Sequence, residues 1–236
     1  YKRQVKGGGH GDYRLIALAP ASVQEMADFV GIAFDLAFKY RNPAIILADG
    51  VIGQMMEKVV LPEQRTRLTD EEVIARCPWA TTGRTHHRTP NIITSLELDP
   101  AEMEKRNIHL QKKYAEIEEN EVRFEELHCE DSEYLIVAFG SCARIAQKAM
   151  EMAREEGIKV GLLRPITLWP FPSKAIAARA AQVKGILTVE LNAGQMVEDV
   201  RLAVECKVPV EHFGRLGGIV PDPDEVITAL KEKLIK

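Results

Sequence analysis

The sequence has 236 residues, of which 46% are hydrophobic and 28% are charged, and this composition predicts a folded globular protein and excludes a chain that is disordered throughout. Its formal net charge of -4 comes from 31 basic and 35 acidic residues spread along the chain, so no basic patch indicates a nucleic acid or an anionic membrane as a partner. We therefore expect neither nucleic-acid binding nor membrane binding.

The first predicted elements are a strand and a helix. Residues 14–19 (RLIALA) form a short apolar run that stops at Pro20, as a buried strand does when proline ends its ladder. Ser22 and Glu25 then have the spacing of a helix capping box, and apolar residues recur at helical spacing as far as Tyr40. We expect a helix that begins after Ser22 and ends near Tyr40.

A second apolar run, residues 44–48 (AIILA), predicts another buried strand, which stops at Asp49 and Gly50. Strand, helix and strand joined by short links predict a crossover unit with parallel strands. After it the periodicity is poor and prolines divide the chain, so residues 53–131 are predicted to connect two domains. Their clearest element is a charged helix from Asp99 to about residue 120, whose narrow apolar stripe favours a solvent-facing bridge.

Residues 132–236 recover a regular alternation of apolar strands and amphipathic helices, which predicts a three-layer α/β domain. A turn with a helix cap is expected at Gly140-Ser141, and the last helix is expected to be capped at Asp222. The predicted strands are 134–139, 160–163, 186–191 and 208–213, and the predicted helices are 144–155, one from 174, 196–204 and one after 222.

The cysteines are too far apart for a Cys-x-x-Cys pair, so they predict neither a zinc site nor an iron-sulfur cluster on this chain. The sequence given contains no signal peptide and no uninterrupted apolar span, and isolated thiols suit a reducing compartment. We expect a cytoplasmic protein whose four thiols are buried and inert: Cys77, Cys129, Cys142 and Cys206.

Ligands of open parallel sheets gather beyond the carboxyl ends of the strands, so the loops that follow strands are the places to search. Asp49 follows a strand directly, and its carboxylate could accept hydrogen bonds from a ligand or cap the next turn. The segment Gly140-Ser141-Cys142 would present backbone N–H groups at a helix N-terminus, which suits an anion. A nucleophilic serine or cysteine is disfavoured there, because no triad partner lies nearby in sequence.

The loop from Gly7 to Asp12 contains three consecutive glycines and His10. Its flexible backbone could approach a ligand closely, and the imidazole could serve as an acid, a base or a hydrogen-bond donor. The loop precedes a strand and lacks the glycine spacing of phosphate-binding loops, so a phosphate site has little support. The alternative is a mobile loop with a solvated histidine.

The pattern Gly-Gln-Met-x-Glu occurs twice, at residues 53–57 and 194–198, each time shortly after a predicted strand. It could be a coincidence, a good strand-to-helix link, an interface or a direct ligand contact. Trp169 and Phe171 are apolar residues among prolines, which favours an interaction surface. The residues predicted to form interfaces are Gln54, Met55, Trp169, Gln195 and Met196.

Taken together, several segments resemble the alpha subunit of 2-oxoacid:ferredoxin oxidoreductases. The resemblance spans essentially the whole chain and is nearest to the types that act on branched-chain 2-oxoacids or on 2-oxoglutarate. It is carried by HGDYR at 10–14, LAPASVQE at 18–25, YRNP at 40–43, LADG at 47–50, GQMME at 53–57, RPITLWPFP at 164–172 and NAGQMVEDVR at 192–201.

The resemblance implies an α/β fold in which residues 1–52 are the C-terminal part of a thiamine-diphosphate-binding, pyrimidine-type domain. Residues 132–236 would then be a domain similar to the C-terminal domain of transketolase. The implied reaction is the oxidative decarboxylation of a 2-oxoacid (3-methyl-2-oxobutanoate or 2-oxoglutarate) with CoA to acyl-CoA, CO2 and reduced ferredoxin. The implied partners are a beta subunit that shares thiamine diphosphate and Mg2+ and carries a 4Fe-4S cluster, subunits of gamma or delta type, and ferredoxin.

Family members have a Tyr-Pro-Ile-Thr-Pro-type motif and a cofactor-activating glutamate further upstream, and we expect such a part to precede Tyr1. No catalytic residue and no metal ligand is therefore assigned in this chain. The resemblance places His10, Gly11 and Asp12 near the cofactor cleft, and we predict that these residues and Asp49 bind the cofactor. Two alternatives stay open: a non-catalytic assembly module, and a beta-type chain of a transketolase or 2-oxoacid dehydrogenase.

Overall fold

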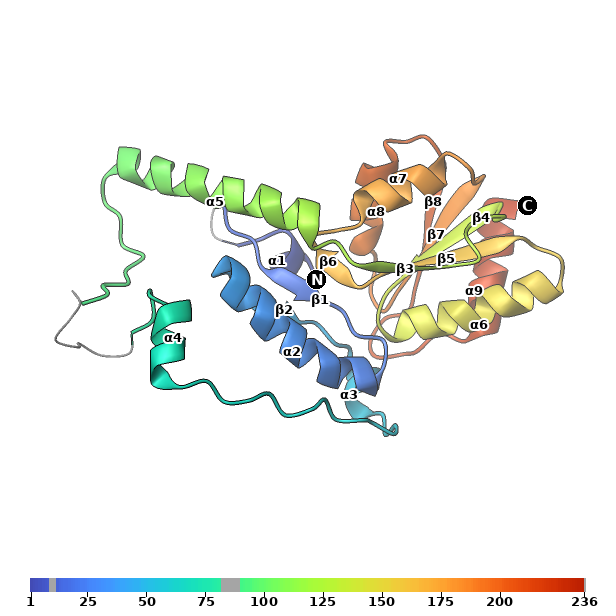
Figure 1. The fold of residues 1–236 in the computed structure, drawn as a ribbon. Coiled ribbons are helices and arrows are strands. Elements are labelled where there is room, and N and C mark those ends of the chain that lie inside the picture. The colour runs from blue at the N-terminus through green and yellow to red at the C-terminus, as the bar shows by residue number, and fades with distance from the viewer. Residues whose placement is uncertain (9–11, 82–89, 236) are drawn as a thin grey trace.

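A computed structural model describes residues 1–8, 12–81 and 90–235 of the chain (Figure 1). The described residues form one sheet of three strands and one of five. Helix α5 (Pro100–Asn120) runs from the outer part of the molecule towards its centre, where strands of both sheets meet (Figure 1).

The three-stranded sheet has the order β2-β1-β6. Strand β1 (Ile16–Leu18) pairs in parallel with β2 (Ala44–Ile46), which confirms both predicted strands and their direction. Strand β1 is fully buried, but β2 is only half-buried because it forms an edge of the sheet, so the prediction of a buried strand is wrong for β2. The third strand, β6 (Thr167–Trp169), runs antiparallel to β1 and comes from the proline-rich loop, where the sequence pattern predicts no strand.

Helix α2 (Val23–Tyr40) packs against β1 and β2 and has the predicted bounds. Its N-terminus shows half of the predicted capping box, because Ser22 Oγ accepts a hydrogen bond from Glu25 N at 3.1 Å. The Glu25 carboxylate accepts instead from Ala21 N, at 2.7 Å. The helix ends at Arg41, whose φ of 47° is left-handed.

The five-stranded sheet has the order β3-β5-β4-β7-β8, and all neighbours are parallel except β3 and β5. Helices α6 (Ser141–Glu155) and α9 (Pro223–Leu230) cover one face, and α7 (Ser173–Ala180) and α8 (Met196–Val204) cover the other, which confirms the three-layer prediction. A π-helical turn, Lys231–Ile235, follows α9. The strands are β3 (Phe124–Leu127), β4 (Tyr134–Ala138), β5 (Val160–Pro165), β7 (Gly185–Glu190) and β8 (Val210–Gly214).

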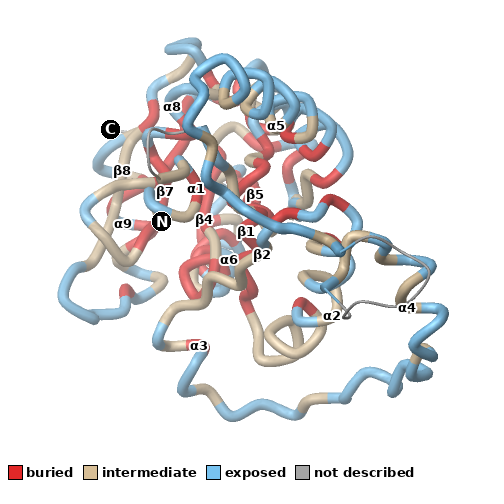
Figure 2. The backbone as a smooth tube through the Cα atoms, turned by 90° about the vertical axis from the view of Figure 1, so that its left-hand side faces the viewer, coloured by how far each residue is buried: buried red, intermediate tan, exposed pale blue. Residues whose placement is uncertain are grey.

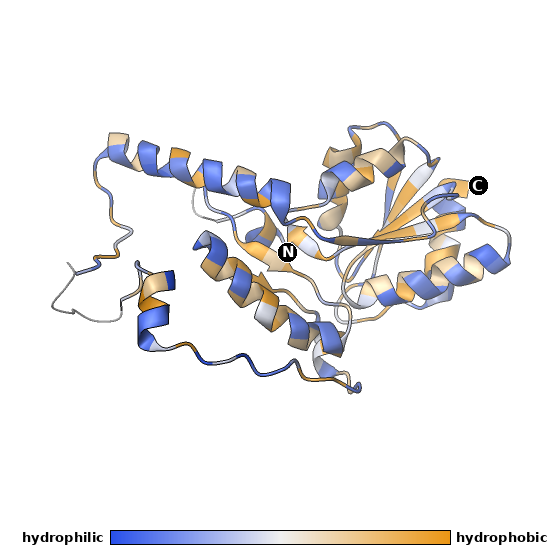
Figure 3. Ribbon diagram, viewed as in Figure 1, coloured by the Kyte–Doolittle hydropathy of each residue, from blue (hydrophilic) through white to orange (hydrophobic). Residues whose placement is uncertain are grey.

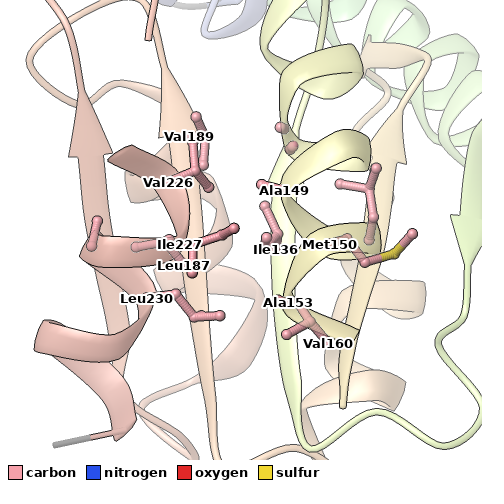
Figure 4. Close-up of a cluster of buried hydrophobic side chains, with 14 of the residues drawn as sticks. Ile136, Ala149, Met150, Ala153, Val160, Leu187, Val189, Val226, Ile227 and Leu230 are labelled. Atoms are coloured by element: carbon pink, nitrogen blue, oxygen red, sulfur yellow. The ribbon is translucent and has the colours of Figure 1, made fainter. Parts of the chain in front are cut away.

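The core of this part lies on both faces of the five-stranded sheet. Figure 4 shows Ile136 of β4 and Leu187 of β7, together with Met150 of α6 and Leu230 of α9, on the face that these two helices cover. All four are at most 1% exposed. Burying a side chain of this size contributes about 1.5–3 kcal/mol to folding, so this face holds much of the stability of the domain.

The described residues of 55–81 and 90–99 are mostly extended and exposed (Figure 2). Helix α3 (Gly50–Gln54) precedes this segment and helix α4 (Asp70–Arg76) interrupts it. Helix α5 follows it and is capped by Asp99, as predicted. Figure 3 shows α5 as largely hydrophilic, in keeping with the predicted bridging helix. Seven large apolar side chains of the segment are 63% to 99% exposed: Met56, Val60, Leu61, Ile92, Ile93, Leu96 and Leu98.

Each sheet contains a strand from a part of the chain that the sequence assigns elsewhere. Strand β3 comes from the predicted connector but belongs to the five-stranded sheet, and β6 comes from the predicted C-terminal domain but belongs to the three-stranded sheet. The short helix α1 (Lys2–Val5) also lies against α8, because the Tyr1 hydroxyl donates to Asp199 Oδ2 at 2.7 Å. The boundaries at residues 52 and 131 stay a prediction.

Within the described residues, no helix is both long and apolar enough to cross a membrane.

Candidate functional site

Two of the four residues predicted to bind the cofactor, His10 and Gly11, lie outside the described residues. The third, Asp12, is exposed, and its backbone carbonyl accepts a hydrogen bond from Gln111 Nε2 of α5 at 3.3 Å. It lines an open groove of about 790 Å³ whose other lining residues belong to α5. Asp12 therefore lies beside α5, at the end of the sheet where β1 begins.

Asp49 lies at the opposite end of that sheet. Strands β1 and β2 are parallel, and Asp12 precedes β1 whereas Asp49 follows β2. The structure therefore does not bring the two carboxylates together, and one compact ligand site does not include both. That either residue binds the cofactor stays a prediction.

The Asp49 carboxylate caps two helices. Its Oδ1 atom accepts hydrogen bonds from Val51 N and Ile52 N, both at 3.0 Å, at the start of α3. Its Oδ2 atom accepts from Ser141 N at 2.8 Å, at the start of α6. Helix α3 follows the three-stranded sheet and α6 packs on the five-stranded one, so this carboxylate joins both parts of the molecule.

Gly140 permits this close approach. Its backbone has φ 61° and ψ -143°, and a Cβ atom at this position would lie 2.6 Å from Asp49 Oδ2. The sequence predicts an anion at the helix N-terminus formed by Gly140, Ser141 and Cys142, and the structure shows a carboxylate of the same chain in that place.

Glu190 performs the same task at the end of β7, and sequence reasoning missed it. Its side chain is fully buried and accepts hydrogen bonds from Met196 N at 2.8 Å, Val197 N at 3.0 Å and Gln195 N at 3.1 Å. These are the N–H groups that the first turn of α8 leaves without partners inside the helix. The signal in the sequence is the one that marks Asp49: an acidic residue that ends an apolar strand just before a turn and a helix.

A cavity of about 180 Å³ lies between these two carboxylates, with Tyr1, Cys142 and Gln195 also in its walls. Burial, together with the charges of Asp49 and Glu190, raises the pKa of the Cys142 thiol to about 12, so the thiol stays protonated and is not a nucleophile at neutral pH. Ligand pockets usually measure about 300–1,000 Å³. The cavity is therefore too small for a cofactor and forms part of the junction between the sheets.

The four thiols differ in their surroundings. Cys129 and Cys142 are buried, and burial raises the pKa of Cys129 to about 11, which confirms the prediction of inert thiols for these two. Cys77 is half-buried. Cys206 is exposed, so the prediction of burial is wrong there; the residue lies in a turn after α8 with a left-handed φ of 60°.

The two copies of Gly-Gln-Met-x-Glu have different local structures, because the first ends α3 and the second begins α8. The glutamate of each copy nevertheless forms an ion pair. Glu57 pairs with Arg144 of α6 at 2.6 Å, and Glu198 pairs with Lys2 at 2.8 Å. Each ion pair joins residues of the two parts of the chain, so these two glutamates form contacts within the molecule.

The residues predicted to form interfaces fall into two groups. Trp169 and Met196 are buried, and the Trp169 ring meets Tyr114 of α5 edge-on at a centroid distance of 5.7 Å. Trp169 thus joins parts of this chain, because β6 is a strand of the smaller sheet, and an interface role for Trp169 and Met196 stays a prediction. Three predicted residues keep some exposure, and for them an interface role stays a prediction: Gln54, Met55 and Gln195.

Across residues 1–8, 12–81 and 90–235 we find no group of three or more His, Cys, Asp and Glu side chains that could hold a metal ion. Mg2+ takes oxygen ligands in a tight octahedral arrangement. The carboxylates that follow strands, Asp49 and Glu190, already accept backbone hydrogen bonds. The described residues therefore do not fit Mg2+ and a diphosphate on their own.

Two protein-family models match this chain. Residues 3–127 match the thiamine-diphosphate-binding domain of pyruvate flavodoxin/ferredoxin oxidoreductases, and residues 132–226 match core domain II of pyruvate:ferredoxin oxidoreductase. The first match covers more than half of the chain. The chain belongs to the pyruvate flavodoxin/ferredoxin oxidoreductase family, which confirms the resemblance drawn from its motifs.

The ketoisovalerate oxidoreductase subunit VorB of Methanothermobacter marburgensis is 47% identical over 232 residues, which are 98% of this chain and 64% of the relative. The 2-oxoglutarate synthase subunit KorA of the same organism is 31% identical over 247 residues, which are 96% of this chain and 66% of the relative. The chain thus spans less than two thirds of the length of the first of these relatives.

Two solved structures share the fold. The 2-oxoglutarate:ferredoxin oxidoreductase of Magnetococcus marinus aligns with a TM-score of 0.74 at 23% identity, over 98% of this chain and 44% of that one. A split-gene transketolase aligns with a TM-score of 0.53 at 14% identity, over 94% of this chain and 57% of that one. These likenesses confirm the predicted fold class, a thiamine-binding α/β part followed by a three-layer domain similar to that of transketolase.

Proposed function

We propose that this chain is part of the alpha subunit of a 2-oxoacid:ferredoxin oxidoreductase, which converts a 2-oxoacid and CoA into acyl-CoA and CO2 and passes two electrons to ferredoxin. The carrying observation is the 47% identity to a ketoisovalerate oxidoreductase subunit along 98% of the chain. The two domain matches, to residues 3–127 and to residues 132–226, support it.

The proposed substrate is 3-methyl-2-oxobutanoate. Identity to the ketoisovalerate oxidoreductase subunit is 47%, whereas identity to the 2-oxoglutarate synthase subunit over a similar length is 31%. The second candidate is 2-oxoglutarate, whose extra carboxylate would need a cationic partner in the substrate pocket.

The proposed cofactor is thiamine diphosphate with Mg2+, shared with a beta subunit, and the proposed 4Fe-4S clusters lie on partner subunits. When bound, thiamine diphosphate supplies the chemistry by which a 2-oxoacid loses CO2. The contribution of this chain is positional. Asp49 fixes the thiamine-binding part against α6, and Glu190 fixes the start of α8 in the same junction. Further partners proposed are gamma- or delta-type subunits and ferredoxin, in the cytoplasm.

The direct test is to produce the complete alpha subunit that contains this chain together with its partner subunits, and to follow reduction of a viologen dye. We expect reduction that requires 3-methyl-2-oxobutanoate, CoA and thiamine diphosphate together. Dye reduction with 2-oxoglutarate alone would move the substrate assignment to the second candidate. A pure, assembled enzyme that is inactive with branched-chain 2-oxoacids, 2-oxoglutarate and pyruvate would contradict the proposed function.

The competing possibilities differ in their partners. A beta-type chain of a 2-oxoacid dehydrogenase would copurify with a lipoyl-bearing protein, and its activity would not reduce ferredoxin. A non-catalytic assembly module would bind the same partner subunits without affecting turnover when Asp49 is replaced. Iron analysis of the copurified partner separates the first possibility from our proposal, and the activity of an Asp49→Asn enzyme separates the second.

A further inference from the structure

A groove of about 620 Å³ lies where the end of α5 meets the proline-rich loop, outside the junction described above. We call it the aromatic groove. Its floor and walls are mainly apolar, and Phe124 at the start of the edge strand β3 is 39% exposed although it belongs to a sheet. The apolar residues that line it are Val122, Phe124, Trp169, Pro170, Phe171, Pro172 and Ala175.

One wall of the aromatic groove is acidic. Glu118 and Glu119 lie in the last turn of α5, are exposed and line the groove. The last turn of a helix carries partial negative charge, so acidic side chains are unfavourable there. Glu121, two residues on, is paired with Lys39 and Arg123, but within the described part of the chain neither Glu118 nor Glu119 forms an ion pair. Among the described residues that line the groove, Lys174 is the only cation.

We propose that the aromatic groove binds a segment of a partner protein that carries an aromatic or large aliphatic side chain flanked by lysine or arginine. The apolar side chain would lie against Phe124 and Phe171, which are only partly buried in this chain. The basic side chains would lie beside Glu118 and Glu119 and supply the cations that the end of α5 lacks. This inference goes beyond the proposed function, because it depends on neither the cofactor nor the reaction.

Synthetic peptides serve as the probe. The test peptide is acetyl-Ser-Lys-Phe-Lys-Ser-amide, one control replaces both lysines by glutamate, and another replaces phenylalanine by serine. Trp169 lines the groove, and the only other tryptophan, Trp79, contacts Phe38 and Arg41. In a Trp79→Phe background, tryptophan fluorescence therefore reports on the groove alone. Fluorescence anisotropy of labelled peptide gives the affinity.

We expect the lysine peptide to bind and to change Trp169 fluorescence, and we expect the glutamate peptide to bind at least about fivefold more weakly. The double variant E118K/E119K should lose about fivefold or more in affinity for the lysine peptide, and Phe124→Ala should lose a similar amount. The matched control is Glu155→Lys, which places a lysine in the last turn of α6, away from the groove, and should change affinity by less than about twofold.

A lysine in the last turn is favourable in both α5 and α6, so a loss of binding in E118K/E119K without a lower thermal midpoint is not a folding change. Equal affinity for the lysine and glutamate peptides, absence of binding by the lysine peptide, or unchanged binding in E118K/E119K would overturn the proposal. Self-association that E118K/E119K removes would identify the occupant as a second copy of this chain and would also overturn it. None of these outcomes bears on the oxidoreductase assay.

Discussion

The five-stranded sheet and the three-stranded sheet differ in how they are completed. The larger sheet has strands of four to six residues, and its parallel strands, which follow one another along the chain with helices between them, are covered on both faces. The smaller sheet has strands of three residues, a half-buried edge in β2, and one strand, β6, that arrives from about 150 positions further along the chain. Most strands of the larger sheet therefore come from successive segments of the chain. The smaller sheet depends on contacts between segments that are far apart in the sequence.

This difference predicts where the chain tolerates change. Substitutions in the centre of the larger sheet should destabilise the protein most. Substitutions at the junction should loosen the smaller sheet first, and substitutions in exposed ion pairs should matter least.

The largest effect is expected for Ile136→Ala in β4, the central strand of the larger sheet. Its side chain is 1% exposed and lies between the sheet and helix α6 (Figure 4), so its removal leaves a cavity. We expect a loss of about 2–5 kcal/mol in the free energy of unfolding. The matched variant is Ile45→Ala in β2, which is half-buried at an edge and should cost about 1 kcal/mol. Urea unfolding followed by circular dichroism measures both, and equal losses would contradict the contrast between the sheets.

An intermediate effect is expected for Gly140→Ala at the junction. The new Cβ would lie 2.6 Å from Asp49 Oδ2, and a φ of 61° with a ψ of -143° strains any residue other than glycine. We expect a loss of about 1–3 kcal/mol. Gly157→Ala is the control, because Gly157 also has a left-handed φ, 85°, but no atom lies within 4 Å of its added Cβ. Hydrogen exchange should show that Gly140→Ala loosens residues around α3 and β2, and a loss confined to the five-stranded sheet would argue against a junction held by Asp49.

A smaller, pH-dependent effect is expected for Glu121. Its burial alone would raise its pKa, but hydrogen bonds from Lys39 and Tyr40 outweigh this and hold the pKa below its usual value of 4.5. The carboxylate therefore binds protons less readily in the folded state, and its contribution is present above about pH 4.5 and is lost as the pH falls through the lowered value.

Glu121→Gln should remove this contribution, of about 1 kcal/mol. The difference in unfolding free energy between the wild-type protein and the variant should then be larger at pH 6 than at pH 3.5. Lys39→Met, which removes one partner of the carboxylate, should reduce the same pH dependence. A difference that does not change between the two pH values would show that Glu121 is not stabilised by these contacts.

The same contrast explains what the sequence predicts correctly and what it does not. Helix α8 has the predicted bounds of 196 and 204 because strand, turn and helix follow one another with clear periodicity. Strand β6 is not predicted, because its three residues lie among prolines and its partner β1 lies far away along the chain. Helix α4 is also missed, although Thr69 and Glu72 form a capping box that the sequence contains.

At the candidate site, the sequence identifies Asp49 as a possible cap of the next turn, which the structure confirms. It does not identify the second partner, Ser141, which is separated from Asp49 by 92 residues. The order of the predicted elements can be read from the sequence. It shows that Asp12 precedes a strand whereas Asp49 follows one. Glu190 has the same local signal as Asp49 and could have been predicted. The burial of Trp169 could not, because it depends on contacts with α5 and β1.

We propose that this chain belongs to an enzyme that makes an acyl-CoA from a branched-chain 2-oxoacid. The most direct test is a mass-spectrometric measurement of the acyl-CoA formed by the assembled enzyme when 3-methyl-2-oxobutanoate and 2-oxoglutarate are offered together at equal concentration with CoA and an electron acceptor. We predict 2-methylpropanoyl-CoA as the main product. Succinyl-CoA as the main product would contradict the substrate assignment, and the absence of any acyl-CoA would contradict the reaction itself.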